Sequence, residues 1–313
     1  MNIYHGLNEI DDIPCPVVTT GSFDGVHIGH KMILQRINKL AREIGGESVL
    51  ITFNPHPRKV LFPDTAGKDL LLINSQQEKI ELLRKTGINN LIIIPFTLAF
   101  SQISSIDFIR SILVGKLHAS KIVIGFNHHF GHNREGNFDY LYELGKFYNF
   151  SVEEIPEQDI HNETVSSTLI RKALQEGKIQ RANAYLDHHY IIAGQFNNGS
   201  GIYENPVFPT VFMKVEEECK LIPPDGVYAV LIEAEKQWFK GILNIKNSRY
   251  GQLRDVIAIV IEIHPFDCPG GLSGKYGTIH FAKHMRNEIE FNSNAEMMQQ
   301  LENDKAEVEQ LIY

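Results

Sequence analysis

The 313-residue chain holds few cysteines and lacks any long apolar run. Its three cysteines are far apart and form no Cys-x-x-Cys pair: Cys15, Cys219 and Cys268. An odd number of widely spaced cysteines argues against a disulfide framework and against a cysteine zinc site. It is typical of a protein in a reducing compartment. Apolar runs such as 91–94 are far too short to span a bilayer, and residues 1–12 lack the features of a secretory signal. We therefore expect a cytoplasmic protein without a membrane anchor.

Positive charge is also scarce. The chain has 30 Lys and Arg against 38 Asp and Glu, a formal net charge of −8, and it has no long basic run. A general nucleic-acid binder needs a positive field to meet the phosphate backbone. The balance therefore disfavours nucleic acid as a partner and favours small-molecule substrates. The composition, 43% hydrophobic and 22% charged, is that of a folded globular protein, and the length predicts two domains.

The first 180 residues alternate between short apolar runs and segments of helical period. Ser75 with Glu78, and Ser104 with Asp107, have the spacing that opens a helix. Such alternation predicts βαβ units and a parallel sheet, an α/β fold of Rossmann-like type. We expect strands at 17–20, 48–53, 91–94, 121–125 and 151–155, and helices at 31–44, from Ser75 to near Gly87, from Ser104 to Gly115 and at 138–148.

The pattern changes near residue 181. A turn-rich stretch at 197–201 is followed by β-like runs at 226–232, 238–244, 256–263 and 278–282. Helical patterning returns from Asn294, with one apolar stripe: Met298, Leu301, Val308 and Ile312. This half therefore predicts a small antiparallel β-barrel or sandwich with a C-terminal helix. We expect domains at 1–183 and 184–313.

The strongest functional signal is residues 21–30, GSFDGVHIGH, between the first strand and the first helix. Ligands of open α/β sheets bind at the carboxyl ends of strands, and a helix N-terminus there offers free N–H groups to phosphate. Gly21, Gly25 and Gly29 let the backbone approach a ligand closely. His27 and His30 are three apart, so both imidazoles can reach one side and stabilise charge on a phosphate. The alternative is a surface turn with two incidental histidines.

This segment resembles the phosphate-binding motif of the nucleotidyltransferase superfamily. Its pattern Gly-x-Phe-Asp-Gly-x-His-x-Gly-His is similar to the prokaryotic FAD synthetase branch, the bifunctional riboflavin kinase/FMN adenylyltransferases. Three later segments resemble further motifs of that branch: 53–57, 125–131 with Arg134 and Gly136, and 166–171. The four motifs occur in order between residues 17 and 171.

The resemblance implies that the N-terminal domain transfers AMP from ATP to FMN, with Mg²⁺ entering together with ATP. His27 and His30 would be catalytic and would hold the α-phosphate and the departing pyrophosphate. The implied binding residues form three sets: Gly21, Ser22, Phe23, Asp24 and Gly29 at the adenine and phosphate end; Asn54, His56 and Asn127 toward the FMN phosphate or Mg²⁺, with Arg134 in the flavin-side loop; and Ser166, Thr168 and Arg171 at the ATP tail.

Simpler roles stay open for some of these residues. His56 can be a turn histidine, and the hydroxyls of 166–168 can cap a helix. His128, His129 and His132 have no nearby cysteine or carboxylate set, so we expect surface or substrate-facing histidines rather than zinc ligands.

The C-terminal half resembles the riboflavin kinase domain usually fused to this adenylyltransferase. Segments 208–210, 224–229 and 244–245 match its motifs. The resemblance implies that Glu262 is the general base and that Thr210 belongs to the Mg²⁺ site. Phe212, however, stands where the family has an asparagine that ligates Mg²⁺, and a phenyl ring supplies no oxygen ligand.

The glycine-rich run before residue 208 is also largely missing. We therefore predict a kinase fold of doubtful kinase activity. Two alternatives stay open: a fully bifunctional enzyme that also phosphorylates riboflavin, and a non-catalytic flavin-binding or assembly module.

Overall fold

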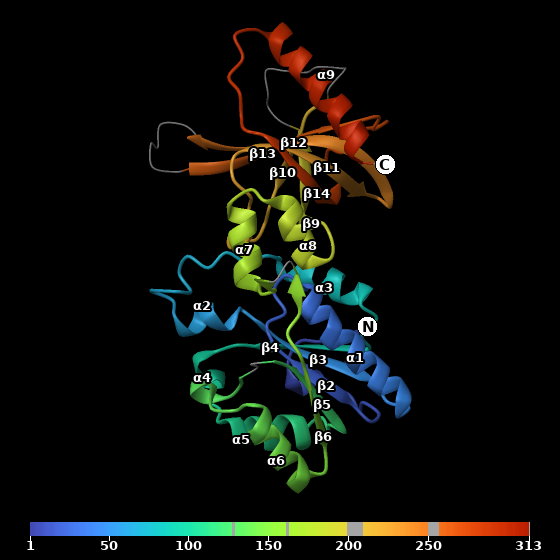
Figure 1. Ribbon diagram of the computed structural model, residues 1–313, viewed down its shortest axis with the longest axis vertical. Helices are drawn as coiled ribbons and strands as arrows, with labels where there is room; N and C mark the ends of the chain where they lie inside the picture. Colours follow the sequence, from blue (N-terminus) through green and yellow to red (C-terminus); the bar gives the residue numbers. More distant parts are fainter. Residues whose placement is uncertain (127–128, 161–162, 199–208, 250–256, 313) are drawn as a thin grey trace. The chain divides into compact units, whose positions relative to one another are not determined.

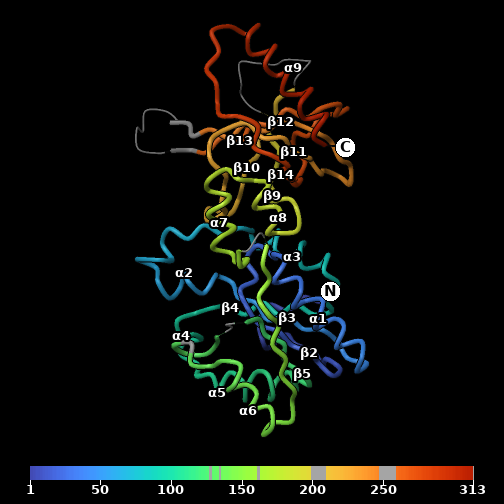
Figure 2. Tube along the Cα trace, viewed as in Figure 1, coloured from blue at the N-terminus to red at the C-terminus, as the bar shows by residue number. Residues whose placement is uncertain are grey.

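The computed structural model describes residues 1–126, 129–160, 163–198, 209–249 and 257–312; Figure 2 draws the others in grey. The chain divides into two compact units. The first comprises Met1–Leu71 and Lys79–Ser166, and the second comprises Leu72–Glu78 and Ser167–Tyr313.

The first unit is built on a six-stranded parallel sheet of order β1-β4-β3-β2-β5-β6. Its strands are β1 (Asn2–Tyr4), β2 (Val17–Thr20), β3 (Ser48–Asn54), β4 (Asn90–Pro95), β5 (Lys121–Gly125) and β6 (Ser151–Ile155). The five strands predicted from the sequence are confirmed. The three-residue edge strand β1 was not predicted, because it is too short to show a period.

Both faces of this sheet are buried, as the near-continuous apolar strands predict. Helix α1 (Ile28–Glu43) packs on β2, β3 and β5. The side chains that alternate with this face, such as Val18, Ile51 and Ile122, pack against the segment Phe108–Val114 and against α6 (Phe138–Tyr148). Figure 1 shows these elements around the sheet.

The predicted helix starts are confirmed at both capping pairs. Ser75 N–H donates to Glu78 at 2.8 Å, and Glu78 N–H donates to Ser75 Oγ at 3.2 Å, at the start of α3 (Gln76–Lys85). Ser104 Oγ likewise accepts from Asp107 N–H at 3.1 Å. The remaining short elements are η1 (Leu7–Glu9), α2 (Pro57–Leu61), α4 (Leu98–Ser101), η3 (His132–Arg134), β7 (Asp159–Ile160) and β8 (Glu163–Thr164).

The segment after Ser104 is not the regular α-helix that the spacing predicts. One α-helical turn, α5 (Ser105–Asp107), widens into a π-helix, η2 (Phe108–Val114). Gly115 N–H therefore bonds to the carbonyl of Arg110, five residues back, at 2.9 Å. The wider turn lets two adjacent pairs of apolar side chains face the sheet, and all four are buried: Phe108, Ile109, Ile112 and Leu113.

The main part of the second unit, from Ser167, begins with α7 (Ser167–Gln175) and α8 (Ile179–Leu186), followed by a closed antiparallel barrel of order β10-β13-β12-β11-β14-β9. Its strands are β9 (Tyr190–Asn198), β10 (Val211–Lys214), β11 (Gly226–Ala234), β12 (Gln237–Arg249), β13 (Ile257–Pro265) and β14 (Tyr276–Arg286). The barrel, one of the two predicted forms, is confirmed. The turn predicted at 197–201 is wrong for Asn197 and Asn198, which pair with β10 in the sheet; 199–201 lie outside the described residues.

The C-terminal helix α9 (Asn294–Leu311) covers an outer face of the barrel. Its predicted stripe is confirmed, since Val308 and Ile312 are buried against barrel residues such as Val227 and Ile242. Arg286 on β14 donates to Asp304 on α9, with a shortest N–O distance of 2.6 Å.

A buried ion pair fixes segment 72–78 in the second unit. Lys220 Nζ donates to Glu78 Oε2 at 2.6 Å and to the carbonyls of Ile73 and Ile191 at 2.6 and 2.7 Å. Both charged side chains are fully shielded from water. The other Glu78 oxygen accepts from Ala193 N–H at 2.7 Å. Glu78 therefore caps helix α3 and also joins segment 72–78 to Lys220 and Ala193, which lie more than a hundred positions later in the chain.

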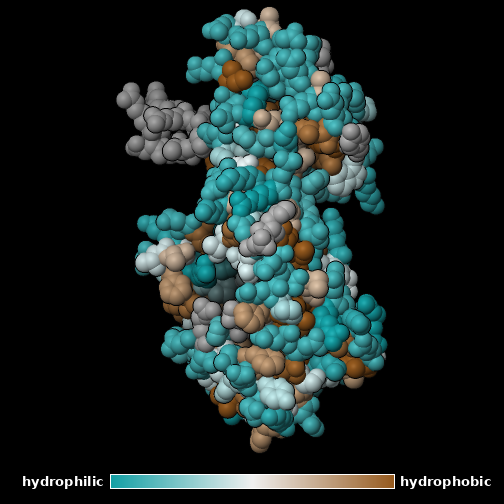
Figure 3. Space-filling model, viewed as in Figure 1, coloured by the Kyte–Doolittle hydropathy of each residue, from teal (hydrophilic) through white to brown (hydrophobic). Residues whose placement is uncertain are grey.

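The surface facing the viewer in Figure 3 is mainly hydrophilic, with brown apolar residues in small groups. Among the residues that the structure describes, no helix has the length and apolarity needed to cross a membrane.

Candidate functional sites

The first candidate site lies at the carboxyl end of β2. The strand order reverses here, because β3 and β4 lie on one side of β2 and β5 and β6 on the other. Such switch points are where open α/β sheets bind ligands. Residues 21–27 lead from β2 into α1, whose N-cap is His27; the His27 side chain makes no capping hydrogen bond. The N–H groups and the positive dipole end of a helix N-terminus favour an anion.

The two predicted histidines lie together. The rings of His27 and His30 stack with centroids 3.6 Å apart and planes 23° apart, and the ring of Phe23 lies 4.5 Å from His30. His27 is buried, and His30 is partly buried with its Nδ1 shielded from water. Burial, together with His27 and Lys79, holds the pKa of His30 well below its ordinary value. At neutral pH His30 is therefore a neutral imidazole with one N–H to donate.

The glycines of the loop make room for these rings. A Cβ on Gly21 would lie 3.0 Å from the ring of Phe23, and a Cβ on Gly29 would lie 3.3 Å from the ring of His27. Gly25 has φ +91°, which favours glycine. Phe23 and Val26 also have positive φ, at 50° and 42°. The loop therefore holds an unusual backbone shape around the imidazole pair.

The other N-terminal candidates lie as follows. Asn54 ends β3, and His56 is the N-cap of α2, where its Nδ1 accepts from Arg58 N–H at 3.2 Å. This contact gives His56 the capping role that the sequence left open. Asn127 and His128 lie outside the described residues, and Arg134 closes η3. Over the described residues there is no group of three or more His, Cys, Asp or Glu that can hold a metal ion.

The Ser/Thr motif lies at the start of α7. Ser166 precedes the helix, and Thr168 and Arg171 lie within its first two turns. Ser166 ends the first compact unit, so Thr168 and Arg171 belong to the second.

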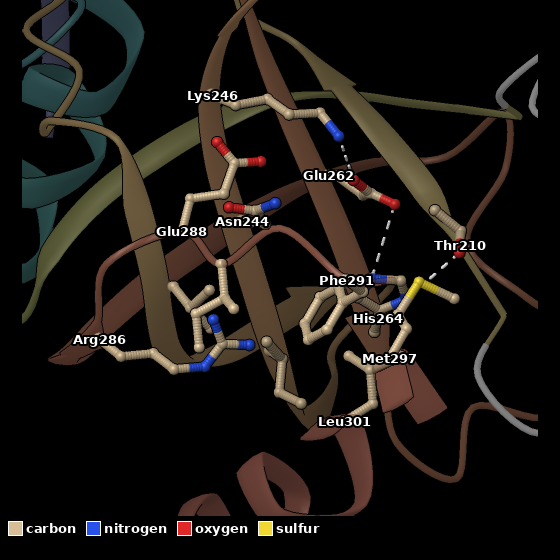
Figure 4. Close-up of a pocket in the computed structure, with 13 residues that line it drawn as sticks. Thr210, Asn244, Lys246, Glu262, His264, Arg286, Glu288, Phe291, Met297 and Leu301 are labelled. Carbon is tan, nitrogen blue, oxygen red and sulfur yellow. Dashed lines mark hydrogen bonds and ion pairs between the residues drawn. The ribbon is translucent and has the colours of Figure 1, made fainter. Parts of the chain in front are cut away.

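The second candidate site is a cavity of about 210 Å³ on the outer face of the barrel, between β12, β13 and α9 (Figure 4). Its polar side chains converge on Glu262. Lys246 Nζ donates to Glu262 Oε2 at 3.2 Å, and His264 Nε2 lies 3.7 Å from Glu262 Oε1. His264 Nδ1 lies 3.2 Å from Thr210 Oγ1. These four residues form one connected polar chain.

The strand register places Phe212 beside this chain. Glu262 is paired with Phe212 of β10 on one side and with Asn244 of β12 on the other, and directly paired residues share a face. The Asn244 Oδ1 is shielded from water and has no hydrogen-bond partner among the described residues. The residues present fit Mg²⁺ poorly, because Phe212 offers no oxygen and the Lys246 ammonium already neutralises the carboxylate.

Sequence reasoning missed Lys246 and Lys79. Lys246 lies two residues after Asn244, so the period of a strand places both on one face. Lys79 is brought to the loop by the fold alone, and no local spacing points to it.

The sheet, its switch point and the loop that enters α1 define a nucleotide-binding α/β protein of the nucleotidyltransferase class. A family model for FAD synthetase matches residues 11–169, and a model for riboflavin kinase matches residues 186–312. The chain belongs to the FAD synthetase family.

The relatives are similar along their whole length. A bifunctional riboflavin kinase/FMN adenylyltransferase from Buchnera aphidicola is 32% identical, covering 97% of this chain and 96% of its own. One from Bacillus subtilis is 32% identical, covering 93% and 90%. A solved structure from Streptococcus pneumoniae, described as a macrolide-efflux protein, has a TM-score of 0.86 over 98% of both chains at 24% identity. That likeness shows the fold.

Proposed function

We propose that this protein makes FAD by transferring AMP from ATP to FMN, with release of pyrophosphate. The observation that carries the proposal is the stacked His27–His30 pair at the N-terminus of α1, at the switch point of the sheet. The FMN adenylyltransferase activity for which its relatives are named supports the same reaction.

The reaction needs no covalent intermediate on the protein. An oxygen of the FMN phosphate attacks the α-phosphorus of ATP in line, and the bond from that phosphorus to the bridging α–β oxygen breaks. Pyrophosphate leaves with the electron pair, so the step requires no proton. Mg²⁺ arrives as part of the Mg-ATP substrate. The protein supplies position and charge stabilisation. The N–H donors of His27 and His30 hold the oxygens that gain charge.

The other binding residues keep the roles that the resemblance implies. Gly21, Ser22, Phe23, Asp24 and Gly29 would shape the adenine and phosphate end. Asn54, His56 and Asn127 would serve the FMN phosphate or Mg²⁺, with Arg134 in the flavin-side loop, and Ser166, Thr168 and Arg171 would contact the ATP tail. We place the adenylyltransferase in residues 1–183 and the kinase-like domain in 184–313. The three cysteines form no disulfide, which supports a reducing, cytoplasmic location.

The test is to incubate the protein with FMN and Mg-ATP and to measure FAD and pyrophosphate. We expect His27→Ala and His30→Ala each to lower turnover by about a hundredfold or more, the loss typical of removing one charge-stabilising donor. His5→Ala, at an exposed histidine, is the matched control and keeps full turnover. Full activity in the double variant would refute the proposal.

A second activity, phosphorylation of riboflavin, is favoured by the kinase domain of the relatives. We propose that it is far slower here than FMN adenylylation. Phe212 lies beside Glu262 in the sheet, and Lys246 occupies one oxygen of the carboxylate that a general base needs free.

A further inference from the structure

A buried lysine lies behind the phosphate loop of the first unit. Lys79 is only 8% exposed. Its Nζ lies 3.5 Å from the carbonyl oxygen of Ser22 and 3.4 Å from Thr52 Oγ1. Thr52 Oγ1 in turn donates to the same Ser22 carbonyl at 3.1 Å. An ammonium and a hydroxyl therefore converge on one backbone oxygen of the loop.

That oxygen precedes the strained part of the loop. Phe23, the next residue, has φ +50°, a conformation that few residues other than glycine adopt. Its ring packs against His30, and His30 stacks on His27. A continuous set of contacts thus runs from Lys79 through the Ser22–Phe23 turn to both imidazoles.

Lys79 also acts on His30 through its charge. Burial is the largest cause that lowers the pKa of His30, and the positive charges of His27 and Lys79 lower it further. Lys79 therefore reaches the imidazole pair both through the contacts of the Ser22–Phe23 turn and through its charge.

We propose that Lys79 is a positioning residue for AMP transfer: it holds the Ser22–Phe23 turn against the His27–His30 pair, so that both imidazoles keep the stacked arrangement in which they donate to phosphate. The proposal rests on the proposed function above. It goes beyond it because it assigns a role to a residue on α3, more than fifty positions from the loop.

The experiment measures His30 and catalysis separately. The imidazole of His30 is titrated by NMR in the ligand-free protein, and kcat and KM for FMN adenylylation are measured in parallel. The variants are Lys79→Met, which removes charge and donor; Lys79→Gln, which removes the charge and keeps a donor; and Lys79→Arg, which keeps both. Lys85→Met removes an exposed lysine from the same helix and serves as the control.

We expect the His30 pKa to rise in Lys79→Met and Lys79→Gln, because a repelling cation is gone, and to stay below its ordinary value, because burial remains. We expect kcat to fall about a hundredfold in Lys79→Met, the loss that a displaced catalytic geometry can cause. The KM for FMN should change little. Lys79→Arg should restore both properties, and Lys85→Met should match the original protein.

An unchanged His30 titration in Lys79→Gln would overturn the proposal, and so would unchanged kcat in Lys79→Met. Lower thermal stability with neither change would leave Lys79 a purely structural residue and would also overturn it. If Lys79→Met does not fold, Lys79→Gln decides. Failure of the proposed function looks different, because the unsubstituted protein would then form no FAD.

Discussion

At the scale of single residues, His30 couples folding to pH. The folded chain holds the His30 pKa well below its ordinary value, chiefly by burial. An unfolded histidine titrates near pH 6.5. As the pH falls through about 6.5, the unfolded chain therefore takes up a proton that folded His30 does not. The free energy of unfolding then decreases until the pH reaches the lower, folded pKa.

We predict that His30→Gln flattens this dependence. Between roughly pH 6.5 and 5, the variant should lose less unfolding free energy than the original protein, by up to about 1.4 kcal/mol per pH unit. His189 and His284, whose pKa values burial also lowers, contribute equally to both proteins and cancel in the difference. Urea unfolding across this range measures it, with exposed His5→Gln as control. Parallel curves for His30→Gln and the original would contradict the assignment.

The candidate residues that the sequence predicts are those whose proposed role lies in local spacing. His27 and His30 are three apart at the start of α1, Gly21 precedes both, and Gly29 lies between them. Local spacing did not predict Lys79 or Lys246, because each contacts or acts on a residue of another element: His30 of α1 for Lys79 and Glu262 of β13 for Lys246. Which cation reaches which carbonyl or carboxylate depends on packing between elements, and a single sequence holds little of that information.

At the scale of elements, the spacing of apolar residues and the helix-capping residues predicted most of the helices and strands of the first unit. Doubly buried strands such as β4 and the cap of α3 follow from composition and spacing alone. The π-turns of η2 do not, since they arise when two adjacent apolar pairs all pack on the sheet. Helix α8 and strand β9 were also missed, where mixed polar and apolar residues give no clear period.

We predict that the attachment of α9 to the barrel depends strongly on the Arg286–Asp304 ion pair and only weakly on the Lys283–Glu307 ion pair. Two pairs join β14 to α9: Arg286–Asp304, in which the aspartate side chain is 4% exposed, and Lys283–Glu307, which is open to water. Removing one partner of a buried ion pair leaves the other charge buried and unpaired, which is destabilising. Exposed ion pairs contribute little to the free energy of unfolding. Asp304→Ala should therefore lower the free energy of unfolding by about 2–3 kcal/mol.

Glu307→Ala, the matched control, should cost less than about 1 kcal/mol. Chemical unfolding of the full chain measures both. Equal losses in the two variants would mean that the difference in burial does not decide how α9 is held.

At the scale of the whole molecule, the two proposed sites differ in the groups that they offer to a phosphate. The first unit has the stacked His27–His30 pair beside the start of α1, at the switch point of its sheet. In the cavity of the second unit, Glu262 is paired with Phe212 across the strands and with Lys246 in an ion pair. Phosphoryl transfer at the proposed kinase site would need a metal and a free base. The sequence pointed to Phe212 as the obstacle, and the structure adds Lys246 to that proposal.

The ratio of two rates in one preparation therefore tests the whole molecule. We predict that FMN formation from riboflavin and Mg-ATP is far slower than FAD formation from FMN and Mg-ATP. Restoring an oxygen with Phe212→Asn and releasing the carboxylate with Lys246→Gly should together raise FMN formation by about tenfold or more, as expected when a metal ligand and a base are regained.

Glu262→Gln in that double variant should remove the gain, because the added rate requires the carboxylate to accept the proton of the flavin hydroxyl. Chromatographic separation of riboflavin, FMN and FAD reads both rates at once. Rapid FMN formation by the unaltered chain, lost in Glu262→Gln, would establish a working kinase. Lys246 would then be a partner that the base leaves during turnover, and Thr210 with water would have to complete the metal shell that Phe212 cannot.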